Sequence, residues 1–195
     1  MRIFKASWKE QLAQAIRTPP ARAEGSDHPG WVQPDQNSLR LAIVGIGNEL
    51  NGDDAAGVLA ARALRASFKD APQAITERIL IIEAGPAPEN FTGPLRRFQP
   101  ELVILVDAAD FDSQPGAITW INWDDMDGFS ASTHTLPPSV FASFLINELE
   151  CQVGVLAIQA RQVELDQPPS PDVLAAVLEL SRGITDILSH PSNGS

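Results

Sequence analysis

Residues 41–58 constrain the fold more than any other stretch, because they describe a buried strand, a turn and the start of a helix. Leu41–Ile46 is a short apolar run with β-branched members, which is typical of a strand covered on both faces. Glycines at positions 45, 47 and 52 interrupt the run, and from Ala55 onward small and apolar residues recur at helical spacing. A strand that leads directly into a helix predicts an α/β fold with a parallel sheet.

The rest of the chain repeats this alternation. Further strands are expected at residues 78–83, 102–107 and 153–158, and helices at 53–68, 89–97, 137–149 and 172–188. Residues 117–123 alternate in polarity, which indicates an edge strand. We therefore expect a three-layer α/β/α sandwich around a mostly parallel, twisted sheet of about five strands, in which one edge strand can run antiparallel.

The N-terminal segment differs from this compact domain. Residues 1–17 can form a helix with an apolar face, and residues 18–38 hold the proline, glycine and polar residues of a linker. We expect a helix and linker at 1–38, one domain at 39–190 and a short tail at 191–195. The helix is an appendage that can dock on the domain or wait for a partner, and a disordered tail is the alternative.

The composition limits the partners. The net charge of −11 argues against non-specific binding to nucleic acid or to an anionic membrane surface. A chain without an apolar run of about 20 residues or a secretory h-region is expected to be cytoplasmic and not inserted in a membrane. Cys151 is the single cysteine, and its apolar neighbours favour a buried small side chain over a nucleophile.

Two adjacent carboxylates, Asp53 and Asp54, follow the first strand. The carboxyl ends of parallel strands form the crevice where ligands bind, so this position suggests chemistry or metal binding. Capping of the following helix is the simpler interpretation, above all for Asp53. A dinucleotide-binding loop would need its third glycine at Leu50, and an acidic pair repels phosphate, so nucleotide binding is set aside.

Three residues form the candidate site: Asp54, Asp107 at the end of the strand at 102–107, and His134 in a long loop at 124–134. Two carboxylates and an imidazole can hold a divalent metal such as nickel or zinc and leave positions open for substrate. Each residue also has an ordinary explanation, because aspartates cap turns and loop histidines commonly make surface hydrogen bonds. A small-molecule enzyme using the same crevice is a rival interpretation.

Four short motifs stand out along the chain. They are Gly45-x-Gly47-Asn48 with Gly52-Asp53-Asp54-x-x-Gly57, Gly85-x-Ala87-Pro88-Glu89-Asn90, Val106-Asp107-Ala108-x-Asp110 with Pro115-Gly116, and Ser132-Thr133-His134-x-x-Pro137. All four resemble motifs of the nickel-iron hydrogenase maturation endopeptidases, and the second resembles the loop found in the formate-hydrogenlyase branch of that family. They occur in the expected order and extend the resemblance over about residues 40–188.

The resemblance implies a specific activity. Members of the family remove a C-terminal peptide from the hydrogenase large-subunit precursor after nickel insertion, and the bound nickel is thought to be the feature they recognise. By position, Asp54, Asp107 and His134 match the family's metal-contacting residues and are our candidate catalytic and metal-binding residues. Nickel would come with the precursor, which is the expected partner, and the protease is expected to act as a monomer.

The mechanism stays open between two classes. A metal held jointly with the precursor could polarise the scissile carbonyl or activate a water, or an aspartate could act as general base in an aspartic-type reaction. A non-catalytic relative that checks the nickel site of the precursor without cutting it is the alternative function.

Overall fold

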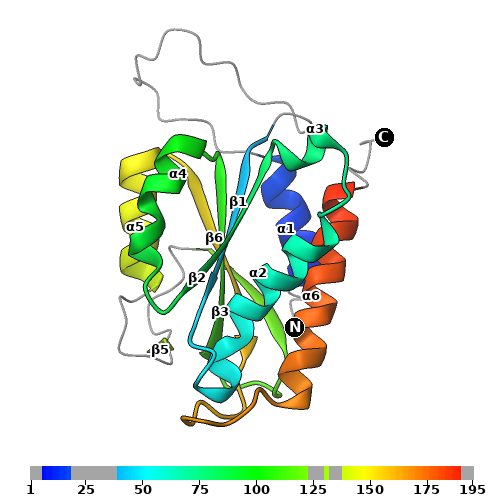
Figure 1. Ribbon diagram of the computed structural model, residues 1–195, viewed down its shortest axis with the longest axis vertical. Coiled ribbons are helices and arrows are strands. Elements are labelled where there is room, and N and C mark those ends of the chain that lie inside the picture. Colours follow the sequence, from blue (N-terminus) through cyan, green and yellow to red (C-terminus); the bar gives the residue numbers. More distant parts are fainter. Residues whose placement is uncertain (1–5, 19–38, 123–129, 132–137, 190–195) are drawn as a thin grey trace, which may run out of the picture.

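The computed structural model describes residues 6–18, 39–122, 130–131 and 138–189, and its elements form three layers (Figure 1). The order along the chain alternates strands with helices, as expected. The elements are α1 (Trp8–Arg17), β1 (Leu41–Ile46), η1 (Gly52–Ala55), α2 (Ala56–Ser67), α3 (Gln73–Thr76), β2 (Ile79–Gly85), η2 (Pro88–Phe91), α4 (Thr92–Phe98), β3 (Leu102–Asp110), β4 (Ile118–Asn122), β5 (Ser130–Ala131), α5 (Pro138–Leu149), β6 (Gln152–Gln159) and α6 (Pro171–Ser189).

The sheet has the strand order β2-β1-β3-β6-β4. Its first four strands are parallel, whereas β4 runs antiparallel to β6 at the edge, and the short β5 pairs antiparallel with the end of β3. The predicted sandwich, with its mostly parallel sheet and antiparallel edge strand, is confirmed. β5 was not predicted, because two residues are too few to carry a strand pattern.

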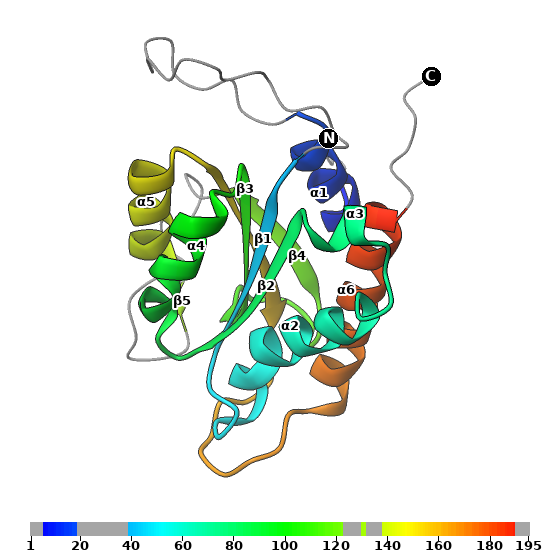
Figure 2. The same cartoon turned by 45° about the horizontal axis from the view of Figure 1, so that its top comes forward.

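Two hydrophobic cores lie on the two faces of the sheet. Helices α1, α2 and α6 cover one face, and α4 and α5 cover the other (Figure 2). Every residue of β1 is buried, and β3 is buried until its last residue. Burial on both faces explains why these two strands are continuous apolar runs in the sequence.

The N-terminal helix α1 docks on the domain. A capping box of Ser7 and Glu10 starts the helix, and Trp8 and Leu12 are buried in the same core as α2 and α6. The Trp8 ring lies so close to Gly183 of α6 that a side-chain carbon there would come within 2.5 Å of it. The helix therefore packs against the sandwich, while the proposed domain boundary at residue 38 stays a prediction.

The first helix of the domain begins later than predicted. Asp53 and Asp54 lie in the 3₁₀ turn η1, and the α-helix starts only at Ala56. The predicted long loop at 124–134 falls mainly outside the described residues, with β5 as its described part. Among the helices described, none is long and apolar enough to cross a membrane.

Cys151 lies between α5 and β6 and is buried, as predicted. Burial raises the pKa of its thiol to about 12, so the thiolate is scarce at neutral pH. Since the thiolate is the nucleophilic form, Cys151 acts here as a small core residue.

Candidate active site

The candidate site lies where the chain passes from β1 into η1 and α2, and glycines allow the backbone to pack closely there. Gly47 has a φ of +131°, and a Cβ on it would lie 1.8 Å from the Asp54 carbonyl oxygen. A Cβ on Gly57 would lie 2.1 Å from the Val106 carbonyl oxygen. Because these two glycines lack a side chain, the backbone of β1, the turn that carries Asp54 and the end of β3 can pack in direct contact.

Asp54 is completely buried in this turn. Its Oδ2 accepts a hydrogen bond of 3.0 Å from the backbone N–H of Asn48, and the Asn48 side chain accepts one of 3.1 Å from Leu50 N–H. The capping interpretation does not hold, because neither the start of η1 nor that of α2 has a side-chain cap. The carboxylate is fixed by the preceding loop and stays at the carboxyl end of β1.

Asp107 lies on β3, the strand beside β1, and is also buried. Its Oδ1 accepts a hydrogen bond of 2.8 Å from Ala108 N–H. Burial, with a further contribution from the negative charge of Asp54, raises the pKa of Asp107 from 3.8 to about 7. The fold thus brings two carboxyl groups close enough to interact, and one of them changes its protonation near neutral pH.

Asp53, the immediate neighbour of Asp54, has a different environment. Its carboxylate accepts four hydrogen bonds of 2.5–3.1 Å, from the N–H groups of Arg161, Gln162 and Ser170 and from the Ser170 hydroxyl. Asp53 therefore joins the η1 turn to the loop between β6 and α6. The predicted capping role is wrong for this residue, because its side chain faces the later loop.

A buried glutamine organises the other neighbouring loop. The Gln159 Oε1 atom accepts hydrogen bonds from Phe111 and Ser113 N–H, and its Nε2 donates to the Asp110 carboxylate at 3.1 Å. Asp110, the last residue of β3 and the second acidic residue of its motif, therefore supports the loop that follows that strand. The Asp110 pKa is lowered, chiefly by the Gln159 hydrogen bond.

His134, the third predicted site residue, lies outside the described residues. The structure brings together Asp54 and Asp107, and within the described ranges it contains no group of three His, Cys, Asp or Glu residues that could hold a metal. The complete predicted ligand set therefore stays a prediction.

A groove of about 580 Å³ lies between α1 and β4, lined among others by Gln14, Trp120 and Gln152. Gln152 begins β6, so this groove is at the amino end of the parallel strands. The carboxylates are at the opposite end, and the groove is therefore separate from the candidate site.

Sequence reasoning missed three supporting residues: Ser170, Gln159 and, in its observed role, Asp53. The serine before Pro171 is a recognisable start signal for α6, but nothing local indicates its partner. These contacts join residues that are 46 to 117 positions apart.

Comparison with known proteins gives one consistent family. The family model described as hydrogenase maturation protease matches residues 58–187, a range that includes Asp107 and His134 but begins after Asp54. The hydrogenase 3 maturation protease of Escherichia coli K12 is 30% identical over 142 residues, covering 72% of this chain and 79% of that protein. A Methanocaldococcus jannaschii protein named for the same family is 33% identical over 130 residues, covering 66% of this chain and 77% of its own length.

Solved structures agree with these relatives. The maturation protease HycI of Thermococcus kodakarensis has a TM-score of 0.69 and 31% identity, covering 77% of this chain and 93% of that one. The endopeptidase HycI of Escherichia coli has a TM-score of 0.62 and 28% identity, covering 80% and 94%. The similarity thus extends over nearly the full length of these structures.

Proposed function

Because this chain belongs to the hydrogenase maturation proteases and is an endopeptidase of hydrogenase maturation, we propose that it removes the C-terminal extension of a nickel-iron hydrogenase large-subunit precursor. Cleavage follows nickel insertion, and the nickel already bound in the precursor is the feature recognised. Nickel is thus part of the substrate. The reaction takes place in the cytoplasm, with the protease acting as a monomer.

The observation that carries this proposal is the buried carboxyl pair, Asp54 and Asp107, at the carboxyl edge of the sheet. Peptide hydrolysis needs a group that takes a proton from water and returns one to the leaving nitrogen. A carboxyl group whose pKa is about 7 can do both near neutral pH, as Asp107 can. Asp107, one member of the pair, therefore has a protonation behaviour that supports this proposal.

The same residues suit nickel. We propose that the carboxylates of Asp54 and Asp107 and the imidazole of His134 contact the precursor's nickel, since oxygen and imidazole nitrogen are both acceptable ligands for this ion. This contact would place the scissile peptide bond beside the carboxyl pair. It would also restrict cleavage to a precursor that has received its metal.

Two chemical routes use these groups. In the aspartic route, the Asp107 carboxylate takes a proton as water attacks the scissile carbonyl carbon, and the proton passes to the amide nitrogen as the C–N bond breaks. In the metal-assisted route, the carboxylates and His134 serve as ligands, and the nickel polarises the carbonyl. Membership of a protease family argues against the alternative of a small-molecule enzyme. The other alternative, a checkpoint protein that binds the precursor without cutting it, is tested by the experiment below.

The test is a processing assay on purified large-subunit precursor, with the C-terminal mass read by mass spectrometry. We expect loss of one discrete C-terminal peptide from nickel-loaded precursor and an unchanged mass for nickel-free precursor. His134→Ala should abolish the cut, and His28→Ala, at a histidine with no assigned role, should leave it unchanged.

Equal cleavage with and without nickel would refute nickel recognition while leaving the endopeptidase role intact. Tight binding of nickel-loaded precursor with no change in mass would instead identify the checkpoint protein. Full processing by the His134→Ala variant would remove His134 from the site.

A further inference from the structure

Two loops at the carboxyl end of the sheet, residues 47–52 and 160–170, are joined into one surface. The Asp166 N–H donates to the Leu50 carbonyl oxygen at 2.7 Å, and the Gly52 N–H donates to the Gln167 carbonyl oxygen at 3.0 Å. Both loops lie together at the lower end of the molecule in Figures 1 and 2. The backbone pairing fixes their relative position, so side chains on the two loops form a single platform.

The platform exposes three large apolar side chains. Leu50 is 60% exposed, Val163 41% and Leu165 66%, and all three lie on these paired loops. Leu50 and Leu165 are at the same junction, since the Leu50 carbonyl oxygen accepts the hydrogen bond from the residue after Leu165. Exposed apolar residues grouped on a fixed surface mark an interaction site more strongly than scattered ones.

The platform is continuous with the candidate active site. Leu50 N–H donates to the Asn48 side chain, and Asn48 N–H donates to Asp54 Oδ2. Two hydrogen bonds therefore separate the platform from the catalytic carboxylate. A macromolecular substrate cleaved beside Asp54 would therefore have the loop that carries Leu50 next to its scissile bond.

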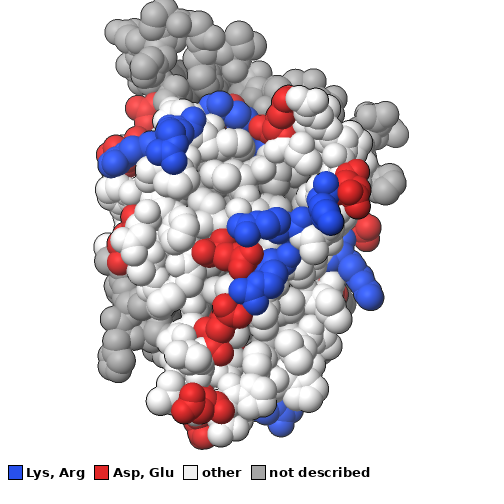
Figure 3. Space-filling model, in the orientation of Figure 1, with Lys and Arg blue, Asp and Glu red and all other residues white. Residues whose placement is uncertain are grey.

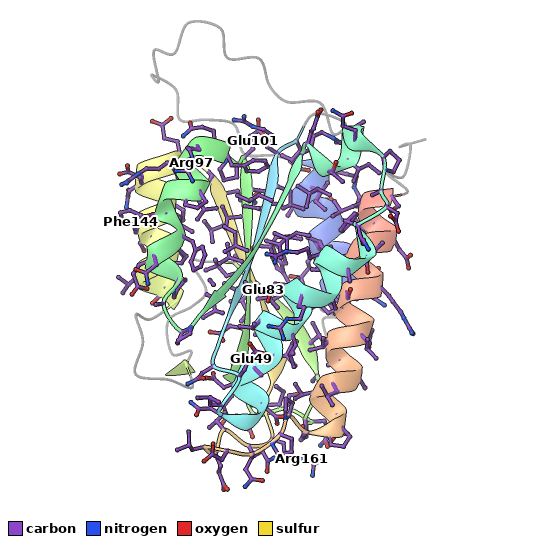
Figure 4. All side chains as sticks on the ribbon, viewed as in Figure 1. Glu49, Glu83, Arg97, Glu101, Phe144 and Arg161 are labelled. Carbon is purple, nitrogen blue, oxygen red and sulfur yellow. The ribbon has the colours of Figure 1, made fainter. Side chains whose placement is uncertain are left out.

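Acidic side chains alternate with the apolar residues along the 160–170 loop. Glu164 and Asp166 are exposed and form no ion pair with any residue in the described part of the chain, whereas Glu49 is held by Arg62. Figure 3 shows the lower end of the molecule as largely uncharged, with acidic groups and one basic group near its tip. Figure 4 shows Arg161 at this tip and Glu49 above it, and Arg161 is paired with Asp172. A complementary surface would be apolar, with lysine or arginine at its margin.

We propose that Leu50, Val163 and Leu165 are specificity-determining residues that dock the large-subunit precursor beside its cleavage site. The precursor covers them with an apolar surface bordered by basic side chains. This inference rests on the proposed function, because it assigns the platform to the same substrate. Asp53 positions the platform, since its four hydrogen bonds hold the 160–170 loop against the turn that carries Asp54.

Pre-organisation is the physical advantage of this arrangement. When a loop becomes ordered only on binding, the loss of conformational entropy lowers the affinity. A loop that is already fixed in the free protein avoids this cost. The Asp53 carboxylate is wholly buried and needs no partner from the substrate to stay in place. The apolar side chains are therefore presented in one position before the precursor arrives.

The test is a matched pair of double variants. Leu50→Ser with Leu165→Ser removes the platform, and Leu174→Ser with Leu178→Ser removes two α6 leucines of comparable exposure, 42% and 53%. Both pairs are exposed, so neither should unfold the protein, and thermal melting checks this. Steady-state cleavage of nickel-loaded precursor gives kcat and KM, and binding of the intact precursor is measured separately by surface plasmon resonance.

We expect the platform variant to raise KM and Kd by about tenfold or more, because it loses contacts that bind the precursor equally before and during the reaction. The kcat should change little, because the carboxylates are untouched. The control pair should stay within about twofold of the unmodified protein. Unchanged KM and Kd in the platform variant would overturn the docking proposal. So would a dimer of the unmodified protein that this variant converts to monomer, because a second copy would then occupy the platform.

The same measurements distinguish failure of the proposed endopeptidase function from failure of the docking proposal. Precursor that binds the unmodified protein without being cut, and binds the platform variant more weakly, supports docking and refutes cleavage. Precursor that neither binds nor is cut overturns both proposals.

Discussion

Asp53 and Asp54 are consecutive, both are completely buried, and their surroundings are opposite. Asp53 is surrounded by four donors from the loop before α6. Asp54 lies on the side of Asp107 and contributes its negative charge to the raised pKa of that residue. One carboxylate stabilises the architecture, and the other helps to make a neighbouring group reactive.

The 3₁₀ turn explains how adjacent residues serve two regions. Successive side chains in such a turn point about 120° apart, so Asp53 can face the 160–170 loop while Asp54 faces β3. Asp53 accepts hydrogen bonds that hold a distant loop, whereas the charge of Asp54 helps to raise the pKa of the neighbouring Asp107. The contrast teaches that burial alone does not determine what an aspartate does.

The largest effect should come from removing the reactive carboxyl group. We expect Asp107→Asn to lower the rate of precursor cleavage by about 10³-fold, because an amide can neither accept nor return the proton. Single-turnover cleavage followed by mass spectrometry measures the rate. Asp112→Asn, at an exposed aspartate in the loop after β3, is the control and should cleave normally. If Asp107→Asn cleaves within about threefold of the normal rate, the surroundings of Asp54 and Asp107 are no more reactive than those of Asp53.

A smaller effect, on stability, should come from Asp53→Asn. The amide replaces one acceptor oxygen with a donor, so at least one N–H of the loop loses its partner and the charge-assisted bonds weaken. We expect the free energy of unfolding to fall by about 3 kcal/mol, measured as a lower midpoint in urea. Asp70→Asn, at an exposed position, should change it by less than about 0.5 kcal/mol. Equal midpoints for both variants would mean that Asp53 does not hold the loops.

The smallest effect is the pH dependence caused by Asp107. Its pKa is about 7 in the folded protein and 3.8 as its ordinary value, so above about pH 4 the folded state holds more protons than the unfolded state. Stability therefore falls as the pH rises from about 4 to about 7, by about 2 kcal/mol between pH 5.5 and 8. Urea unfolding of the unmodified protein relative to Asp107→Asn measures this contribution. A difference between the two proteins that is constant with pH would show that Asp107 does not titrate in this range.

Much of the fold could be predicted from local patterns. The apolar run at 102–107 indicated β3, the alternation at 117–123 indicated the edge strand β4, and the alternation of strands and helices gave the layers. The rule that parallel strands end at one edge predicted that Asp54 and Asp107 would lie near each other. Residue type and strand position suggested that pair, and the match to the family's motifs selected it over the ordinary explanations.

The supporting contacts could not be predicted, because they depend on loop conformation. Asp53 and Ser170 are 117 positions apart, and nothing in either segment identifies the other. The 3₁₀ form of residues 52–55 was also missed, since helical spacing does not separate a tight turn from the first turn of an α-helix.

The contact between Trp8 and Gly183 has a consequence for how the protein is made. Trp8 is synthesised before Gly183, which appears only with α6. Until α6 is made, the face of the sheet that α1, α2 and α6 cover lacks one of its helices, and its core side chains are accessible to chaperones and to other chains. The packing of α1 on α6 is therefore completed only after α6 has been synthesised.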